Sequence, residues 1–497
     1  MGAAPLSDRF RALLTEAPAS TPAVGAGDTW WTWSQIGRTA TDVAQALEQW
    51  HLPEGTRVGV ALRNRPEYVA AVLAVLATHR CLTTINPLRP AEQLAADLER
   101  TAVSVLVTDS ELPVSGLTDA TALILLGQDG TVQTRPGTAP AAGEPLPGTA
   151  IEMLTSGTTG PPKRIRLGYA QLNASLSSIT GSRGSDSLLP RFSSAVSIVA
   201  TPMVHISGLF HVINTIYSGR RLFLLDRFRV ETWVAAVERY RPRTSGLVPA
   251  ALRSVLDAGI DPARLASLAS VTAGTAPCPP DLADAFYQRF GIPVLANYGA
   301  TEFAGAIAGW TLGDHTQWWE TKRGSVGRPF PGVQIQAVDQ KSGDPLTPGQ
   351  QGLLEIRSPQ VGAGDWVRTS DLGRVDGDGF VWIDGRADDV IIRGGFKIHP
   401  GTVEKALRAY PGVRDAAVVG IPDPRLGSVP AAVIELMPGT EQPDEADLLE
   451  FARQRLLPYE VPVELHVADV LPRTASLKVS RMDVLSLVDE ARQQGRP

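Results

Sequence analysis

Residues 149 to 163 form an apolar run followed by a segment whose side chains suit a polyphosphate. The run Thr149–Leu154 is typical of a short buried strand. In the segment after it, glycines allow backbone N–H groups to turn inward, hydroxyls add further hydrogen-bond donors, and a lysine adds a compact positive charge. Together these groups can replace the water that phosphate oxygens lose on binding. The candidate phosphate-binding residues are Thr155, Ser156, Gly157, Thr158, Thr159, Gly160 and Lys163.

The segment has two other interpretations. A stretch of this composition also occurs as a flexible surface loop. A Walker A loop is excluded by spacing, because Gly157, Gly160 and Lys163 stand three residues apart and Arg164 follows the lysine.

A second set of polar side chains occurs where an apolar strand ends, at Asn297–Glu302. Open α/β sheets bind ligands at the carboxyl edge of their strands. An aromatic ring there can stack on a base, a threonine can donate to phosphate, and a glutamate can hold Mg²⁺ through hard oxygen atoms. Taken alone, the same residues also fit a strand-end turn with a surface glutamate. The candidates are Asn297, Tyr298, Gly299, Thr301 and, for the metal, Glu302.

The elements needed to position these groups follow from the hydrophobic pattern. Short strands and amphipathic helices alternate over residues 28–130, and the alternation resumes after the phosphate-binding segment, which predicts a mostly parallel sheet covered on both faces. Residues 110–148 read as a loose connection. From about residue 324, short strands separated by Gly, Pro and Asp predict a small antiparallel sheet or barrel, and the last hundred residues predict a compact α+β unit.

Composition limits the class of protein. A chain of 497 residues is too long for one ordinary core, so two or more domains are expected. A net charge of −6 argues against nucleic-acid binding, which needs a basic face. Cys81 and Cys278 cannot build a disulfide framework or a structural zinc site. Without a visible signal peptide or a membrane-length apolar run, a cytoplasmic location and no membrane contact are expected.

Five motifs, in family order, resemble those of the adenylate-forming enzymes, which include acyl-CoA synthetases, luciferases and the adenylation domains of peptide synthetases. They are 155–163, 297–302, Thr369–Gly373, Asp384–Asp389 and Leu471–Arg481. The resemblance implies an α/β fold with a large N-terminal domain, residues 1–387, built from two doubly wound parallel subdomains and a small β-barrel-like subdomain. It also implies a small mobile α+β domain, residues 388–497, and a monomer or homodimer.

The resemblance also implies roles for individual residues. Lys478 would bridge carboxylate and α-phosphate, Arg386 would lie near ribose and α-phosphate, and Asp388 would be the hinge between domains. Asp371 would accept hydrogen bonds from the ribose hydroxyls, a task that suits a bidentate acceptor. Gly394 and Gly395 would form a turn that lines the acceptor tunnel. Further nucleotide-binding positions are Gly274, Thr275, Ala276 and Ile383, and the acid pocket would be lined by His205, Ile206, Ser207, Gly208, Leu247, Ala273, Asn297, Gly299 and Ala304.

The implied reaction is activation of a carboxylic acid by MgATP as acyl-AMP, followed by transfer of the acyl group. Small residues with Ser207 and Asn297 favour a flat, partly polar acid such as an aromatic one. Coenzyme A is the expected acceptor, and an amine, as in amide bond synthetases, is the alternative. A carrier-protein acceptor, a luciferase-type oxygenation and a non-catalytic nucleotide sensor are further alternatives. The chain departs from the family at Ser370 and Leu477, where glycine is usual.

Overall fold

The computed structural model describes residues 5–112, 121–137, 143–154, 164–180, 188–362, 364–474 and 477–493. Contacts divide the chain into two compact units. The first runs to residue 334 and also takes in Arg357–Asp365, and the second comprises Ile335–Ile356 and the chain from Trp366 onward. The segment predicted to bind phosphate, residues 155–163, lies outside the described residues.

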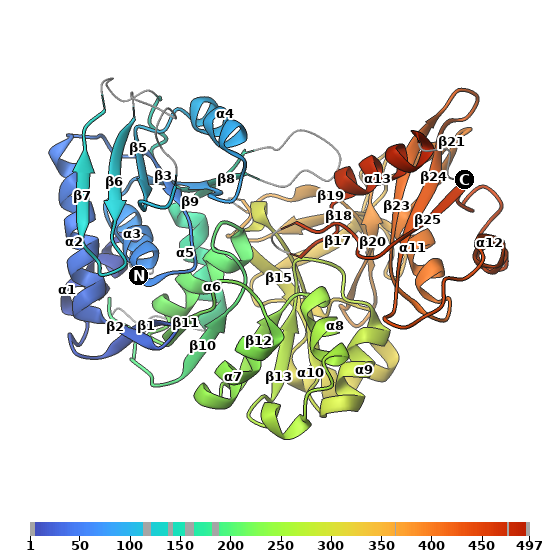
Figure 1. Ribbon diagram of the computed structural model, residues 1–497, viewed down its shortest axis with the longest axis horizontal. Coiled ribbons are helices and arrows are strands. Elements are labelled where there is room, and N and C mark those ends of the chain that lie inside the picture. Colours follow the sequence, from blue (N-terminus) through green and yellow to red (C-terminus); the bar gives the residue numbers. More distant parts are fainter. Residues whose placement is uncertain are drawn as a thin grey trace. The chain divides into compact units, whose positions relative to one another are not determined.

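A seven-stranded sheet in the first unit has the order β7-β6-β5-β3-β4-β8-β9 (Figure 1). Its inner strands β6, β5, β3, β4 and β8 pair in parallel, and β7 and β9 pair antiparallel to it at the edges. Helix α3 joins β3 to β4, and helix α4 joins β4 back to β5. The elements are β3 (Arg57–Ala61), α3 (Pro66–Ala77), β4 (Cys81–Ile85), α4 (Ala91–Thr101), β5 (Val105–Thr108), β6 (Ala122–Leu126), β7 (Val132–Arg135), β8 (Thr149–Leu154) and β9 (Arg164–Gly168).

The two crossovers run in opposite directions along this sheet, so right-handed connections place α3 and α4 on opposite faces. The cores agree with this arrangement. Val58 and Val60 of β3 belong to the large cluster that includes all the apolar residues of α3, whereas Ala61 packs with Leu94 and Leu98 of α4. The sheet is therefore doubly wound, as the sequence predicted.

Two further sheets complete the first unit. One has the order β10-β11-β1-β2 and the other the order β12-β13-β14-β15-β16, in which β12, β13 and β14 are parallel. Their elements are α1 (Leu6–Glu16), β1 (Pro22–Ala26), β2 (Thr29–Thr32), α2 (Trp33–Gln49), α5 (Tyr169–Thr180), β10 (Val196–Val199), α6 (Ile206–Tyr217), β11 (Arg221–Leu224), α7 (Val230–Tyr240), β12 (Thr244–Leu247), α8 (Pro249–Asp257), η1 (Pro262–Leu265), β13 (Ser270–Ala273), α9 (Pro280–Phe290), β14 (Val294–Ala300), η2 (Thr301–Phe303), β15 (Gly305–Gly309), α10 (Leu312–Lys322) and β16 (Arg328–Pro329).

The second unit contains two sheets. The antiparallel strands β17-β18-β19-β20 form the small sheet expected after residue 324, and β22-β21-β24-β23 with β25 beside β24 form the C-terminal sheet. Helices α11 and α13 pack against β23 and β24. The bounds are β17 (Gln334–Val338), β18 (Gly352–Arg357), β19 (Val367–Val375), β20 (Val381–Arg386), β21 (Ile391–Arg393), β22 (Phe396–Ile398), α11 (Pro400–Arg408), β23 (Val413–Asp423), β24 (Gly427–Leu436), α12 (Glu445–Arg453), β25 (Glu464–Ala468) and α13 (Arg481–Gln493).

The α/β class predicted from sequence is confirmed, and two local expectations are wrong. Residues 110–148 are more than a loose connection, because Ala122–Leu126 extends the seven-stranded sheet and pairs with Val132–Arg135. Strand β14 continues to Ala300, so Asn297–Ala300 lie within a strand instead of following it. Strand β14 is longer than expected because β15 pairs with it. Beyond Ala296, where the parallel strand β13 no longer pairs with β14, the antiparallel strand β15 satisfies the backbone hydrogen-bonding groups of β14.

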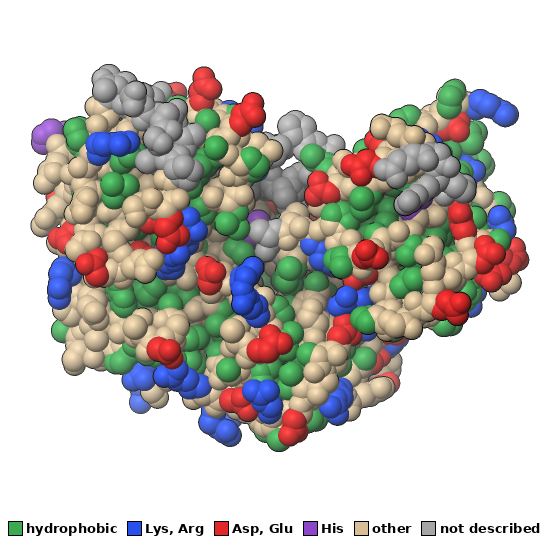
Figure 2. Space-filling view, in the orientation of Figure 1, with side chains coloured by type: hydrophobic (Ala, Val, Ile, Leu, Met, Phe, Trp, Pro, Cys, Tyr) green, Lys and Arg blue, Asp and Glu red, His purple; other side chains and the backbone are tan. Residues whose placement is uncertain are grey.

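Figure 2 shows acidic and basic side chains interspersed over the face in view. Among the described residues, no helix is long and apolar enough to cross a membrane.

Candidate active site

Three parallel strands of the first unit bring predicted acid-pocket and nucleotide residues to one carboxyl edge. Leu247 pairs with Ala273, and Ala273 pairs with Ala296, so β12, β13 and β14 are in register there. Asn297 follows in β14, and its Oδ1 lies so close to Gly274 that a Cβ at that position would be 2.3 Å away. Gly274 is therefore needed for close approach, and Asn297 covers the backbone of the predicted adenine strip.

Thr275, the residue after Gly274, has a backbone conformation that is rare for its type. Its φ of 70° is in the left-handed region, which β-branched residues seldom adopt. Within the part of the chain that the structure describes, its buried Oγ1 has no hydrogen-bond partner. Strain and an unsatisfied buried hydroxyl in one residue are typical of ligand-binding positions.

Helix α6 supplies the other wall expected for the acid pocket. His205 is its N-cap residue and is half-buried, and the partly exposed Ser207 and the buried Gly208 occupy the first turn. A Cβ on Gly208 would lie 2.2 Å from the carbonyl oxygen of Pro202, so glycine sets how closely α6 approaches the preceding loop. Ile206 is partly exposed, and Ala304, which follows η2, is fully buried.

His211 lies one turn along α6 from Ser207 and Gly208, and sequence reasoning missed it. Its Nε2 is 2.8 Å from Oγ of Ser197, and its ring lies 3.9 Å from the position of a Cβ on Gly246, next to Leu247. Burial, with a smaller contribution from Arg220, lowers the pKa of His211 to about 4, so the imidazole is neutral at physiological pH. The helical spacing of three and four residues from Gly208 and Ser207 was the signal that could have identified it.

Glu302 lies on η2 and is exposed, with its backbone oxygen held by Nε2 of Gln171 at 2.9 Å. Among the described residues, no group of three or more His, Cys, Asp or Glu side chains could hold a metal ion. A lone carboxylate fits Mg²⁺ only together with phosphate oxygens and water, which is the usual environment of this ion at ATP sites.

Tyr298, four residues before Glu302, is buried, and its ring packs edge-on against Phe303 with centroids 6.0 Å apart. Thr301 is partly exposed at the start of η2.

In the second unit, Asp371 of β19 lies opposite Arg386 in the neighbouring antiparallel strand β20. The Arg386 guanidinium donates to both carboxylate oxygens of Asp388, at 2.8 and 2.7 Å, and to Oγ of Ser370 at 2.7 Å. The hydrogen-bonded Asp388 carboxylate raises the pKa of Arg386 further above its usual value. Ser370, which departs from the usual glycine, therefore orients the arginine. Ile383 lies on the same strand, opposite Gly373.

Gly394 and Gly395 form the two-residue turn between β21 and β22. Both have positive φ, 57° and 91°, as a type I′ hairpin turn requires. The predicted turn is thus present, and its place in an acceptor tunnel stays a prediction. The exposed ring of Phe396, the next residue, stacks on Tyr459 with centroids 4.6 Å apart.

Lys478 lies at the end of a short hairpin that precedes α13. The amide of Thr474 donates to the carbonyl of Lys478 at 2.8 Å, and the amide of Leu477 donates to the carbonyl of Thr474 at 2.8 Å. Leu477 has φ 61°, the left-handed conformation that a glycine adopts without penalty. Strands β8 and β9, on either side of the predicted phosphate-binding segment, pair antiparallel, with Leu154 opposite Arg164.

This combination of a doubly wound N-terminal unit and a C-terminal unit carrying the Lys478 hairpin defines an adenylate-forming fold. The model of the AMP-binding enzyme family matches residues 10–366, and that of the AMP-binding enzyme C-terminal domain matches residues 402–478. The chain belongs to this family and is an ATP-dependent, AMP-forming ligase.

Individual relatives are similar along nearly the whole chain. A 2-succinylbenzoate–CoA ligase of Geobacillus kaustophilus is 30% identical, with 93% of this chain and 94% of the relative covered. The structure of an o-succinylbenzoate CoA synthetase of Bacillus subtilis, in complex with its acyl-adenylate intermediate, matches with a TM-score of 0.80 and 25% identity over 97% of this chain and 98% of that one. An amide bond synthetase of Marinactinospora thermotolerans matches with a TM-score of 0.79 and 26% identity over 97% and 100%.

Proposed function

We propose that this enzyme activates a compact aromatic carboxylic acid as acyl-AMP, releases pyrophosphate, and transfers the acyl group to coenzyme A. The observation that carries the acid class is the carboxyl edge of β12, β13 and β14. Ala273 and the glycines put few side chains on this edge, which suits a flat group, and Asn297 and the neutral His211 carry hydrogen-bonding atoms for a polar substituent. Similarity to a 2-succinylbenzoate–CoA ligase supports the same class.

The chemistry requires activation because a carboxylate would have to expel oxide. Attack on the α-phosphorus of ATP instead expels pyrophosphate and gives the acid a good leaving group. Lys163, Arg386 and Lys478 would offset the negative charge gathered in the transition state. Mg²⁺, held by Glu302 and the phosphates, would add further electrostatic stabilisation. His205 would orient the acid and does not need to act as a base, because the carboxylate is already ionised at neutral pH.

For the second half-reaction, we propose that residues 388–497 turn about Asp388, withdraw Lys478 and bring Gly394 and Gly395 to the acyl-adenylate. A hinge must change its φ and ψ without disturbing a core, and Asp388 is exposed at the end of β20, which suits it to this task. The need for both MgATP and coenzyme A also supports a cytoplasmic location, where the two are supplied together.

An amine acceptor, giving an amide, is the second candidate. Leu477 in place of glycine keeps this candidate open, because a side chain in the left-handed conformation departs from the family pattern next to Lys478, in the hairpin that must withdraw before the second half-reaction. The match to an amide bond synthetase over the full length of that chain supports the same alternative.

The test is acid-dependent ATP–pyrophosphate exchange with a panel of benzoate, cinnamate, 2-succinylbenzoate and a long-chain fatty acid. Exchange with one of the aromatic acids, and AMP as the nucleotide product, is expected. Coenzyme A or a simple primary amine is then added, and the products are weighed by mass spectrometry. Formation of ADP, or exchange only with the fatty acid, contradicts the proposal, and complete absence of exchange indicates a nucleotide sensor.

A further inference from the structure

The hairpin that carries Lys478 is tied to the body of the second unit on its N-terminal leg. The side chain of Leu471 is fully buried in the core beneath α13, and its amide donates to Oε2 of Glu435 at 2.9 Å. Arg473 and Val479 face each other in an antiparallel bridge. The amide of Ser480 donates to the carbonyl of Pro472 at 2.8 Å, which closes the base of the hairpin.

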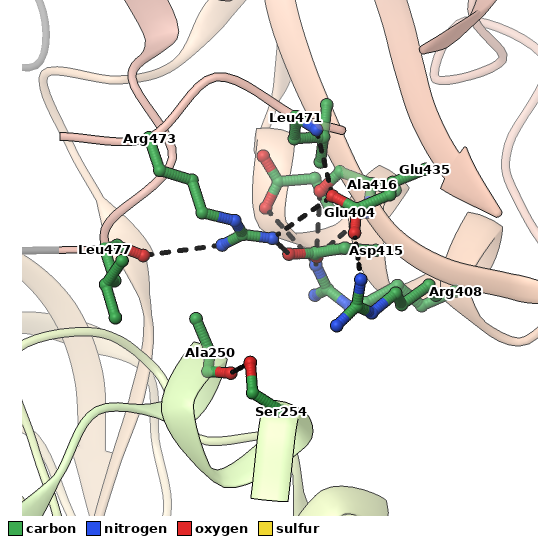
Figure 3. Close-up of polar contacts among 11 residues, drawn as sticks. Ala250, Ser254, Glu404, Arg408, Asp415, Ala416, Glu435, Leu471, Arg473 and Leu477 are labelled. Atoms are coloured by element: carbon green, nitrogen blue, oxygen red, sulfur yellow. Dashed lines mark hydrogen bonds and ion pairs between the residues drawn. The ribbon is translucent and has the colours of Figure 1, made fainter. Parts of the chain in front are cut away.

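Arg473 connects this leg to the sheet and to the tip of the hairpin (Figure 3). Its Nη2 lies 2.7 Å from Oδ2 of Asp415 and 3.5 Å from Oε2 of Glu435. Its Nη1 donates at 3.4 Å to the carbonyl of Leu477, the residue immediately before Lys478. One planar guanidinium therefore joins two carboxylates of β23 and β24 to the backbone next to the lysine.

A second arginine holds the other leg. Arg481, the first residue of α13, pairs with the buried Asp389 and lies 3.6 Å from Oε1 of Glu404. Arg408 lies within 4.0 Å of Glu404 and 3.4 Å from Asp415, which links the two legs through alternating charges. Burial raises the pKa of Glu404, and the arginines around it oppose that effect.

We propose that Arg473 is a positioning residue for the adenylation half-reaction, acting through the backbone of Lys478. The proposal rests on the role of Lys478 in the proposed function. A lysine ammonium on a flexible four-carbon stem is aimed only if its backbone is fixed. Here the preceding Leu477 occupies a left-handed conformation, which persists only when its surroundings hold it. The hydrogen bond from Arg473 to the Leu477 carbonyl supplies that restraint.

When the Arg473 side chain is removed, both carboxylates that it contacts, Glu435 and Asp415, still have other arginine and amide partners. Glu435 keeps Arg414 at 2.8 Å and the Leu471 amide, and Asp415 keeps Arg408 and the Ala416 amide at 2.9 Å. Neither carboxylate becomes an isolated buried charge, which would otherwise be strongly destabilising. The substitution therefore acts on the hairpin, and the rest of the unit stays folded.

The first experiment compares Arg473→Met with Arg492→Met. Arg492 is a matched control, because it forms an exposed ion pair with Glu464 at 2.7 Å in the same unit and lies near the C-terminal end of α13, far along the helix from the hairpin. Arg473→Met is expected to slow ATP–pyrophosphate exchange with benzoate or cinnamate about tenfold or more, while acyl transfer from the synthetic adenylate to coenzyme A changes less than about twofold. Arg492→Met should change neither rate. Arg473→Lys, which keeps the Asp415 pair, should recover part of the exchange rate.

A double-mutant cycle separates positioning from general stability. In a Lys478→Ala background, Arg473→Met should cause no further loss of exchange, because its effect passes through the lysine. An equal loss of both half-reactions, or an effect that adds to that of Lys478→Ala, overturns the proposal.

A second measurement needs no acid substrate. Hydrogen–deuterium exchange of the peptide containing Thr474, Leu477 and Lys478 should be faster in Arg473→Met than in the wild type and unchanged in Arg492→Met, with the remaining peptides of the unit unaffected. Unchanged exchange of this peptide overturns the proposal. If the wild-type protein shows no acid-dependent pyrophosphate exchange, the proposed function fails, and deuterium exchange alone still decides whether Arg473 fixes the hairpin.

Discussion

The carboxyl edge of β12–β14 and the Lys478 hairpin position their residues by different means. At the sheet edge and on helix α6, glycines stand where a Cβ would meet another atom: one on Gly274 would lie 2.3 Å from Oδ1 of Asn297, and one on Gly208 of α6 would lie 2.2 Å from the Pro202 carbonyl oxygen. At the hairpin, the restraint comes from arginines that span carboxylates and backbone carbonyls, with Arg473 at the centre.

The difference corresponds to what each region is proposed to do. Close packing has one solution and resists displacement, which suits a pocket that must keep its shape through both half-reactions. Charge-assisted hydrogen bonds reach across several elements, which suits a loop that must stay rigid while residues 388–497 turn together, as we propose. Steric substitutions should therefore damage the first region, and charge substitutions the second.

The largest expected effect is that of Lys478→Ala. Adenylate formation, measured as pyrophosphate exchange, should fall by about two orders of magnitude or more, because an electrostatic contact made in the transition state is lost. ATP binding, measured by calorimetry, should persist. Near-normal exchange in this variant would show that the hairpin does not serve adenylation, and the contrast between the sheet edge and the hairpin would then have no functional meaning.

His211→Gln tests whether protonation of the buried His211 imidazole destabilises the first unit. The folded pKa of His211 is lowered to about 4 from an ordinary 6.5, so on acidification the unfolded chain takes up the proton first and stability is lost as the pH falls through this window. Between pH 6.5 and about 4.5 the wild type should lose about 2 kcal/mol more than His211→Gln, in which glutamine can still bond to Ser197. The measurement is urea unfolding across that range, and parallel pH profiles would contradict the assignment.

Gly208→Ala should destabilise the first unit by roughly 1–3 kcal/mol through overpacking against the Pro202 carbonyl. Gly313→Ala is the matched control, because the nearest atom to its added Cβ is 3.9 Å away on the surface helix α10, where alanine favours the helix. Thermal unfolding should shift in opposite directions for the two variants. A neutral Gly208→Ala would mean that close packing does not set the position of α6.

Leu477→Gly should have the smallest effect and the opposite sign. Relief of a left-handed leucine, partly offset by the flexibility of glycine in the unfolded chain, should stabilise the hairpin by roughly 0.5–1 kcal/mol. Deuterium exchange of the 471–481 peptide is the local readout. Faster exchange after this substitution would show that the leucine side chain itself contributes to the restraint.

Sequence alone predicted the parts of this molecule that depend on local pattern. Short apolar runs alternating with helical segments over residues 28–130 predicted the strand–helix alternation of β3, α3, β4 and α4, and the family resemblance predicted the turn at Gly394 and Gly395. Residues 110–148 were misread, since Ala122–Leu126 is short and lies in a segment rich in turn-forming residues, and only the neighbouring β5 makes it a strand.

The hairpin restraint could not be predicted, because its members are distant in the chain. Asp415, Glu435 and Arg473 come from β23, β24 and the loop before α13, and no periodicity relates them. The spacing of His211 from Ser207 and Gly208 could have identified it, but its partner Ser197 could not be predicted, because Ser197 is on another element. In both cases the sequence shows a charged or polar side chain, and only the tertiary fold shows which groups that side chain contacts.

The ion pair between Arg386 and Asp388 has a consequence for nucleotide affinity. Arg386 gives its Nε and one Nη2 hydrogen to Asp388, so these donors are occupied in the structure. If Arg386 has its proposed place beside ribose and α-phosphate, nucleotide and carboxylate would compete for one guanidinium, and a measured dissociation constant for ATP would contain the cost of that exchange. In that case nucleotide binding would release Asp388, two residues past β20, from its partner and so loosen the proposed hinge.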